Sequence, residues 1–212
     1  MNSPKVVAEI GCNHKGDLKI AKEMIAVAKS FCGAHYVKFQ KRNNKELLPP
    51  DQYNAPHPVP ANAYGNTYGA HREYLEFSVE QHKELMDYCE ETGIGYSTSV
   101  WDVTSAREMA SLGPDFLKVP SASNLHFEML GVLCDEFGGK IQLSLGMTTQ
   151  KEEDEIVDFF EKKGRNKDLR LHVWIPCPSR PDSSSGNYPF KAKVRQFSRS
   201  YWLFRPSSRH CA

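Results

Sequence analysis

The fold is decided by residues 94–119, which read IGYSTSVWDVTSAREMASLGPDFLKV. In our interpretation Ile94–Thr98 (IGYST) and Asp115–Val119 (DFLKV) are short strands, and Val103–Leu112 between them is a helix that Gly113-Pro114 stops. Short strands that alternate with helices of about 10–15 residues indicate a parallel sheet. We therefore predict an α/β fold.

The same alternation extends in both directions along the chain, which makes about six strand–helix units. Further strands are expected at Lys5–Ile10, His35–Phe39, Lys140–Ser144 and Leu169–Val173. Further helices are expected from the cap Asp17 to Gly33, from the cap Ser78 to Gly93, at Leu125–Phe137 and at Thr149–Lys163. Periodicity alone does not separate an open doubly wound sheet from a barrel. No GxGxxG follows the first strand, which removes the usual argument for a dinucleotide site.

Residues 41–76 break this alternation. They hold five prolines and many asparagines and tyrosines. Such a stretch is too long for an ordinary connection between a strand and a helix. We predict a functional loop that lies over one face of the sheet.

The overall composition is that of one globular domain. The chain has 212 residues and a net charge of +1, which gives no general reason to expect binding to nucleic acid or to a membrane. It has no apolar run of about 18 residues and no secretory signal at its start, so we expect a soluble, cytoplasmic protein. Its six cysteines are scattered without CxxC pairs, and we expect them to be reduced, unpaired thiols.

Polar side chains gather where the expected strands end. These residues are Glu9, Lys38, Gln40, Ser97, Thr98, Lys118, Ser121 and Ser144. In parallel α/β folds the carboxyl ends of the strands lie at one edge, which is where the chemistry takes place. Two lysines and several hydroxyl groups at this edge would bind a phosphate or a carboxylate, and Glu9 would be the acid able to act as a base or to orient a hydroxyl group.

Each of these residues also has a structural interpretation. A serine or threonine at a strand end is often a turn or cap residue, and a lysine there is a possible ion-pair partner for Glu9. A Schiff-base aldolase would also use a lysine, but it needs that lysine among apolar neighbours. Two lysines among hydroxyl groups are more typical of an anion site.

The histidines show no metal-binding spacing, since neither HxH nor HExxH occurs. His14 follows the first strand and is about equally consistent with a pocket residue and with a loop histidine. We expect His57 and His71 to be exposed in the long segment, and His82 and His126 to lie on helix surfaces. His172 is expected to line the sheet or to enter the core.

Five motifs in this order resemble the barrel domain of the N-acetylneuraminate (sialic acid) synthase family: AEIGCNHKGD, VKFQKR, YSTSVWD, LKVPSASN and LSLGMTT. The resemblance covers about residues 4–173. It implies a (β/α)8 TIM-barrel type of fold, of which this chain would hold an incomplete part. It also implies an enzyme that condenses phosphoenolpyruvate with an N-acetylmannosamine-like aldose to give a sialic-acid-type nonulosonate and phosphate.

The resemblance also assigns roles to residues. Lys38, Thr98, Lys118, Ser121 and Ser144 would hold phosphoenolpyruvate, Gln40 would contact the amino sugar, and Glu9 would act as the catalytic acid near the aldehyde and the attacking water. Synthases of this family use a divalent metal, manganese or magnesium, whose histidine ligands lie in later motifs that are missing from this chain. Full-length relatives are homodimers.

The chain departs from the family pattern after about residue 172. From Val173 onward it has one acidic residue, Asp182, against seven lysines and arginines, and it shows no helical or alternating period. With the reading frame moved forward by one base, and with suitable third bases, this segment is able to encode the missing motifs. We therefore expect residues 1–172 to be a partial TIM barrel, and residues 173–212 to be a non-native, irregular tail from a frameshift.

Two other interpretations stay open. In the first, the chain is part of another synthase that condenses phosphoenolpyruvate with an aldose, such as one that makes octulosonate phosphate. In the second, it is an inactive fragment that only binds phosphoenolpyruvate. Because the tail replaces two expected strand–helix units, we expect poor stability and little activity.

Overall fold

The computed structural model describes residues 4–174 and 200–202. Its strands form a single sheet in which every neighbouring pair runs parallel. The strands are β1 (Val7–Gly11), β2 (Tyr36–Lys41), β3 (Gly95–Val100), β4 (Phe116–Val119), β5 (Lys140–Ser144), β6 (Leu169–Trp174) and β7 (Ser200–Trp202). The predicted parallel α/β fold is therefore confirmed.

The order of the strands answers the question that periodicity left open. They lie in the sheet in the order in which they occur along the chain, from β1 to β7. A doubly wound sheet reverses its strand order at a switch point, whereas a TIM barrel adds each strand beside the previous one. The described sheet is thus of the barrel type, and it is an incomplete barrel with β1 at one edge.

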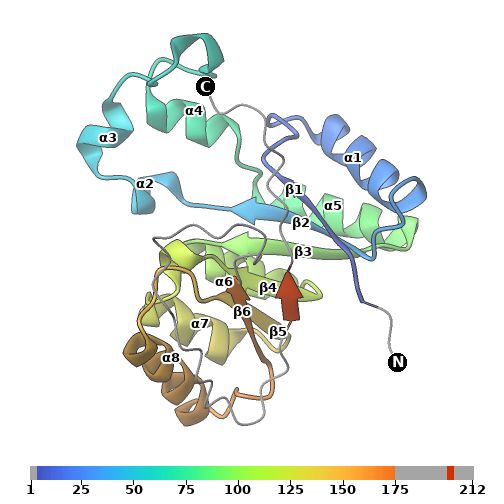
Figure 1. Cartoon of the computed structure of the whole chain (residues 1–212). Helices are drawn as coiled ribbons and strands as arrows, with labels where there is room; N and C mark the ends of the chain where they lie inside the picture. The colour runs from blue at the N-terminus through green and yellow to red at the C-terminus, as the bar shows by residue number, and fades with distance from the viewer. Residues whose placement is uncertain (1–3, 175–199, 203–212) are drawn as a thin grey trace, which may run out of the picture.

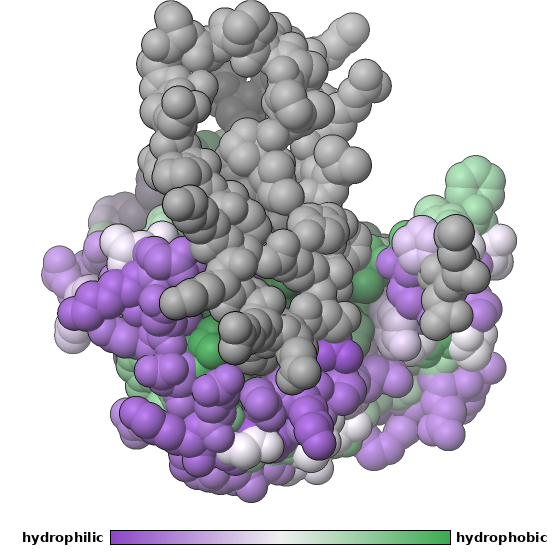
Figure 2. All heavy atoms as spheres, turned by 60° about the horizontal axis from the view of Figure 1, so that its bottom comes forward, coloured by the Kyte–Doolittle hydropathy of each residue, from purple (hydrophilic) through white to green (hydrophobic). Residues whose placement is uncertain are grey.

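Helices connect consecutive strands and cover the outside of the sheet (Figure 1). The longer ones are α1 (Leu18–Ser30), α5 (Val79–Thr92), α6 (Val103–Leu112), α7 (Phe127–Glu136) and α8 (Gln150–Lys162). Helix α1 packs on α5, and α6 packs on α7. The coloured part of the face turned forward in Figure 2 is mostly hydrophilic, with hydrophobic residues between, as is expected when helices turn their apolar sides to the sheet.

The two faces of the sheet differ in chemistry because side chains alternate along each strand. The face toward the helices carries the apolar core, which includes Val37, Phe39, Tyr96, Leu117, Val119, Ile141, Leu143, Leu169 and Leu171. The residues between them face the inside of the curved sheet. That inner face is polar, since it carries Lys38, Ser97, Ser99, Lys118, Gln142, Ser144 and His172.

Local signals set the ends of the helices as predicted. The Asp17 side chain accepts hydrogen bonds from the first backbone N–H groups of α1. Ser78 and Gln81 form a capping box at the start of α5. Gly93 and Gly113 end α5 and α6 with positive φ angles of 71° and 66°, a backbone conformation that glycine adopts without strain.

The segment that we predicted to be a loop contains short helices instead. It holds α2 (Asn44–Leu47), α3 (Pro50–Asn54), the 3-10 turn η1 (Pro60–Asn62) and α4 (Tyr68–Tyr74). Pro50 lies at the start of α3 and Thr67 caps α4, so proline and polar residues that suggested a loop are helix-starting residues here. This segment lies beyond the carboxyl end of β2 (Figure 1), and we call residues 42–76 the excursion.

The expected tail lies mostly outside the described residues. Within it, the backbone of β6 continues to Trp174, and Ser200–Trp202 form β7, which pairs in parallel with β6. The sequence pattern had indicated no regular structure there. The cysteines among the described residues, Cys12, Cys32, Cys89 and Cys134, are free thiols, while Cys177 and Cys211 lie outside those residues. Among the described helices, none has the length and apolar character needed to cross a bilayer.

Candidate functional site

Lys38 lies at the centre of the polar inner face. It sits on β2 opposite Glu9 of β1 and Ser97 of β3, and its side chain is only 9% exposed. Its ammonium group forms an ion pair with the Glu9 carboxylate and donates a hydrogen bond of 3.0 Å to the Ser99 hydroxyl. A nearly buried charge of this kind needs such partners, because desolvation without them costs several kcal/mol.

Lys118 of β4 lies on the same inner face, opposite Ser99. Burial lowers its pKa, the positive charge of Lys38 lowers it further, and the negative charge of Glu9 opposes both effects. His172 of β6 belongs to the same electrostatic group. Burial, followed by the charges of Lys118 and Lys38, lowers the pKa of His172 to about 4, so its imidazole is neutral at pH 7. The structure thus brings the two predicted lysines onto one face, where the Glu9 carboxylate pairs with Lys38 and its charge also acts on Lys118.

Gln40 and Glu9 meet around Gly11 at the end of β1. A Cβ atom on Gly11 would lie 3.4 Å from the Gln40 amide nitrogen and 3.6 Å from a Glu9 carboxylate oxygen. The pairing of β1 with β2 shifts register between Glu9 and Gly11, and Gly11 has a φ of +57°. A break of this kind in a strand redirects its side chains, and such breaks are common beside active sites. The Glu9 carboxylate and the Gln40 amide both lie beside this break.

Ser121 follows β4 and Ser144 is the last residue of β5, and these two strands are neighbours in the sheet. The Ser121 hydroxyl approaches Gly146 so closely that a Cβ atom there would lie 2.6 Å from it. The Asn124 amide joins the two segments by donating to the backbone oxygens of Ser144 at 3.0 Å and Gly146 at 3.2 Å. Both serines are therefore at the rim formed by the strand ends, while their contact with a ligand stays a prediction.

Thr98 is not brought to this group. It lies on the helix-facing side of β3, opposite Phe39, and it is fully buried. Because side chains alternate along β3, the residues that face Lys38 and Lys118 are its neighbours Ser97 and Ser99. Ser99 is a member of this polar group that the sequence reasoning missed. The strand ends at Val100, two residues after the predicted end at Thr98. A prediction with the longer strand would have placed Ser99 on the same face as Ser97.

His82 was predicted to lie on a helix surface, and this was wrong. It is fully buried with Leu85 and Cys89 on the side of α5 that packs on the sheet, and its Nδ1 lies 2.5 Å from the Tyr96 hydroxyl. Burial lowers its pKa to about 3, with a further contribution from Lys41. His14 is also buried, with its ring stacked on Phe77 at 4.0 Å, and its Nδ1 accepts a hydrogen bond from the Gly16 backbone N–H at 3.1 Å, as the interpretation of a loop histidine expects.

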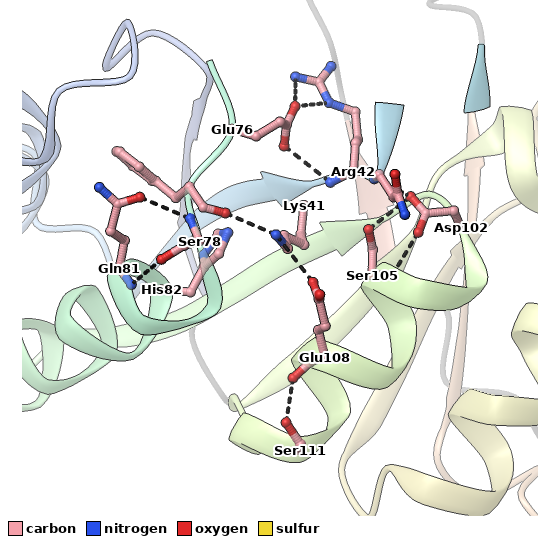
Figure 3. Close-up of polar contacts among 12 residues, drawn as sticks. Lys41, Arg42, Glu76, Ser78, Gln81, His82, Asp102, Ser105, Glu108 and Ser111 are labelled. Carbon is pink, nitrogen blue, oxygen red and sulfur yellow. Dashed lines mark hydrogen bonds and ion pairs between the residues drawn. The ribbon is translucent and has the colours of Figure 1, made fainter. Parts of the chain in front are cut away.

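A second set of contacts anchors the excursion beside the site (Figure 3). Arg42 and Glu76, one from each end of the excursion, form a nearly buried ion pair of 2.6 Å. Arg42 also donates to the Cys12 sulfur at 2.8 Å, which ties the excursion to the turn after β1. Asp102 accepts from the backbone of Asn43 at 2.7 Å while it caps α6. These contacts hold the excursion in place at the carboxyl ends of β1, β2 and β3.

The metal that the resemblance implies does not fit the described residues. Within residues 4–174 and 200–202, no group of three histidine, cysteine, aspartate or glutamate side chains is arranged to hold a metal ion. Glu9 is engaged by Lys38, and His172 lies beside two positive charges that repel a cation. We therefore assign no reaction step to a metal in this part of the chain.

A profile of the NeuB family matches residues 24–183, about three quarters of the sequence. The chain belongs to the NeuB family. The match extends past residue 172, where we expect the native sequence to end, and that boundary stays a prediction. Family membership confirms the resemblance that the five motifs indicated.

Curated relatives of this NeuB-family chain are named as synthases. It is 31% identical over 185 residues to N-acetylneuraminate-9-phosphate synthase of Drosophila melanogaster, which covers 87% of this chain and 49% of the relative. It is 41% identical over 131 residues to the Homo sapiens protein of the same name, covering 59% of this chain and 34% of the relative. N,N'-diacetyllegionaminic acid synthase of Campylobacter jejuni is 29% identical over 181 residues, with 84% and 54% covered. The chain thus spans about a third to a half of these relatives.

Solved structures agree on the fold. The N-acetylneuraminic acid (sialic acid) synthetase of Leptospira borgpetersenii, solved in complex with citrate, superposes with a TM-score of 0.66 at 24% identity and covers 83% of this chain and 55% of that one. A truncated 3-deoxy-D-arabino-heptulosonate 7-phosphate synthase of Thermotoga maritima superposes with a TM-score of 0.52 at 12% identity, with 79% and 50% covered. At these identities the likeness concerns the fold alone.

Proposed function

We propose that this chain carries the phosphoenolpyruvate site of a synthase that joins phosphoenolpyruvate to an N-acetylmannosamine-like aldose. The main support for this proposal is that Lys38 and Lys118 lie on the same polar inner face of the sheet, with Glu9 paired to Lys38. Phosphoenolpyruvate bears a phosphate and a carboxylate, and two ammonium groups with hydroxyl donors nearby match that pair of anions. The named synthases among the relatives support the same class of reaction.

In the proposed reaction C3 of phosphoenolpyruvate attacks the aldehyde carbon of the open-chain sugar. Water adds at C2, and the tetrahedral intermediate releases phosphate, so the products are a nonulosonate and inorganic phosphate. Lys38, Lys118, Ser121 and Ser144 would hold the anionic groups, and Ser99 would position Lys38 through its hydrogen bond. Glu9 would orient the attacking water and accept its proton, or, when protonated, donate a proton to the aldehyde oxygen, on the side where Gln40 would contact the sugar.

Calorimetric titration of the 212-residue chain with phosphoenolpyruvate tests this proposal. We expect saturable binding, and we expect Lys118→Met to weaken it at least about tenfold, because a charged hydrogen bond is worth about 1.5–3 kcal/mol. Lys151→Met is the matched control, since Lys151 is 87% exposed on α8 and should leave the affinity unchanged. Equal affinities for all three proteins, or no binding by the unmodified chain, would rule the site out.

A phosphate-release assay with manganese and a sugar tests the second half of the reaction. We propose that turnover by this chain is low, because the metal ligands of the family are not assembled by the described residues. Parallel assays with N-acetylmannosamine, its 6-phosphate and a phosphorylated pentose distinguish a sialic-acid-type synthase from one that makes octulosonate phosphate. Release of phosphate with the pentose phosphate alone would favour the latter enzyme.

A further inference from the structure

Glu9 differs from its partner Lys38 in its exposure to solvent. Its side chain is 52% exposed, whereas that of its partner Lys38 is 9% exposed. It lies on β1, which has a neighbouring strand on only one side among the described residues. The register shift between Glu9 and Gly11 follows directly, so the strand is irregular where the side chain leaves it. A carboxylate that is half exposed is already partly solvated, so water is available to solvate it when it leaves Lys38.

The partner of Glu9 is fixed. Lys38 lies between β1 and β3, and its ammonium group is held by the Ser99 hydroxyl at 3.0 Å as well as by Glu9. The Glu9 carboxylate and the Ser99 hydroxyl are therefore both partners of the Lys38 ammonium group. The second cation, Lys118, has no ion pair with an acid among the described residues and stays available for another anion.

We propose that Glu9 is a built-in competitor for the anion site, which occupies Lys38 when no ligand is bound and has to leave it before phosphoenolpyruvate binds. This inference rests on the proposed function. Its physical basis is that a tethered carboxylate acts at a high effective concentration and lowers the apparent affinity of any free anion for the same cation.

Glu9→Gln tests the competition, because it removes the charge and keeps the shape. We expect phosphoenolpyruvate to bind this variant roughly two- to fivefold tighter than the unmodified chain, the range given by a partly exposed ion pair. Glu84→Gln is the matched control, since Glu84 is 51% exposed and pairs with Lys22 on the outer helices. Its affinity should equal that of the unmodified chain.

Glu9→Asp separates direct occupation from a long-range effect of charge. Aspartate keeps the charge but is shorter by one methylene group, so it should release Lys38 and also tighten binding. Inorganic phosphate, titrated into the same proteins, should follow the same order. If Glu9→Gln binds phosphoenolpyruvate equally or more weakly, or if Glu9→Asp behaves like the unmodified chain, competition by contact is wrong.

Two further outcomes keep the tests distinct. If no variant binds phosphoenolpyruvate, the proposed function fails and this inference fails with it. If the unmodified chain binds it and Glu9→Gln does not tighten, the proposed function stands and only the competition is wrong. Should the Glu9 variants unfold, a structure of the unmodified chain with bound phosphoenolpyruvate decides, because the Glu9 carboxylate has to be found away from Lys38.

Discussion

Breaking the ion pair between Arg42 and Glu76 should destabilise this protein much more than breaking an exposed pair. The Glu76 carboxylate accepts from the Arg42 Nε at 2.6 Å and from its backbone nitrogen at 3.1 Å, and both side chains are about one-tenth exposed (Figure 3). Desolvation of the two charges offsets most of the attraction between them. Removing one partner, however, leaves the other charge buried, which costs about 3–5 kcal/mol.

We therefore expect Glu76→Gln to lower the free energy of unfolding by about 3 kcal/mol and Arg42→Met by a similar amount. The double variant should lose less than the sum of the two, by about 1–3 kcal/mol, because no buried charge remains without a partner. Urea denaturation measures these differences from the midpoints, provided that the slopes agree.

The exposed pair of Lys83 and Asp87 on α5 supplies the control for this experiment. Both side chains are more than half exposed, so Asp87→Asn should change the free energy of unfolding by less than about 0.5 kcal/mol. Additive losses in the double variant, or losses below about 1 kcal/mol in the single ones, would show that the pair is not buried in the way described.

Three further results are expected. Burial lowers the pKa of His82 to about 3 and that of His14 to about 4, below the value of about 6.5 in the unfolded chain. The contribution of each neutral imidazole to the free energy of unfolding is therefore complete above about pH 6.5. As the pH falls below that value, it is lost by up to about 1.4 kcal/mol per pH unit for each histidine. The urea midpoint should decrease as the pH is lowered from about 7 to about 5, and it should decrease less in His82→Gln than in the unmodified chain. An equal decrease in the two proteins would contradict this explanation. Thr149→Ala removes the capping box with Glu152 at the start of α8 and should cost about 1 kcal/mol in thermal or urea unfolding, whereas Lys151→Ala should cost almost nothing. Sequencing of the coding DNA across codon 173 should show that the frame one base forward encodes the missing family motifs, and third bases that do not allow this would disprove the frameshift.

Local signals explain why much of the fold was predictable. Val103–Leu112 and Lys140–Ser144 have the predicted bounds, since a glycine stop and a short apolar run are complete within a few residues. The meeting of Lys38 and Lys118 was also predictable, because parallel strands place their carboxyl ends at one edge. These features need no knowledge of distant contacts.

Features that depend on the face of an element were harder to predict. The run Tyr96–Val100 is buried on both faces, so its sequence does not show whether Thr98 or Ser99 points inward. Likewise, the burial of His82 depends on the Tyr96 hydroxyl, which comes from another element. The Arg42–Glu76 pair joins the two ends of the excursion, and a spacing of this kind carries no local signal.

The placement of the site residues separates binding from turnover. Lys38 and Lys118 come from β2 and β4, and Ser121 and Ser144 from the ends of β4 and β5, so the groups that we propose for phosphoenolpyruvate all lie on consecutive strands within the described residues. The metal that would act on the acceptor has no set of three ligands within residues 4–174 and 200–202. We therefore propose that the two halves of the reaction depend on different parts of a full synthase. A sample that binds phosphoenolpyruvate and releases no phosphate would follow from this division, without any damage to the anion site itself.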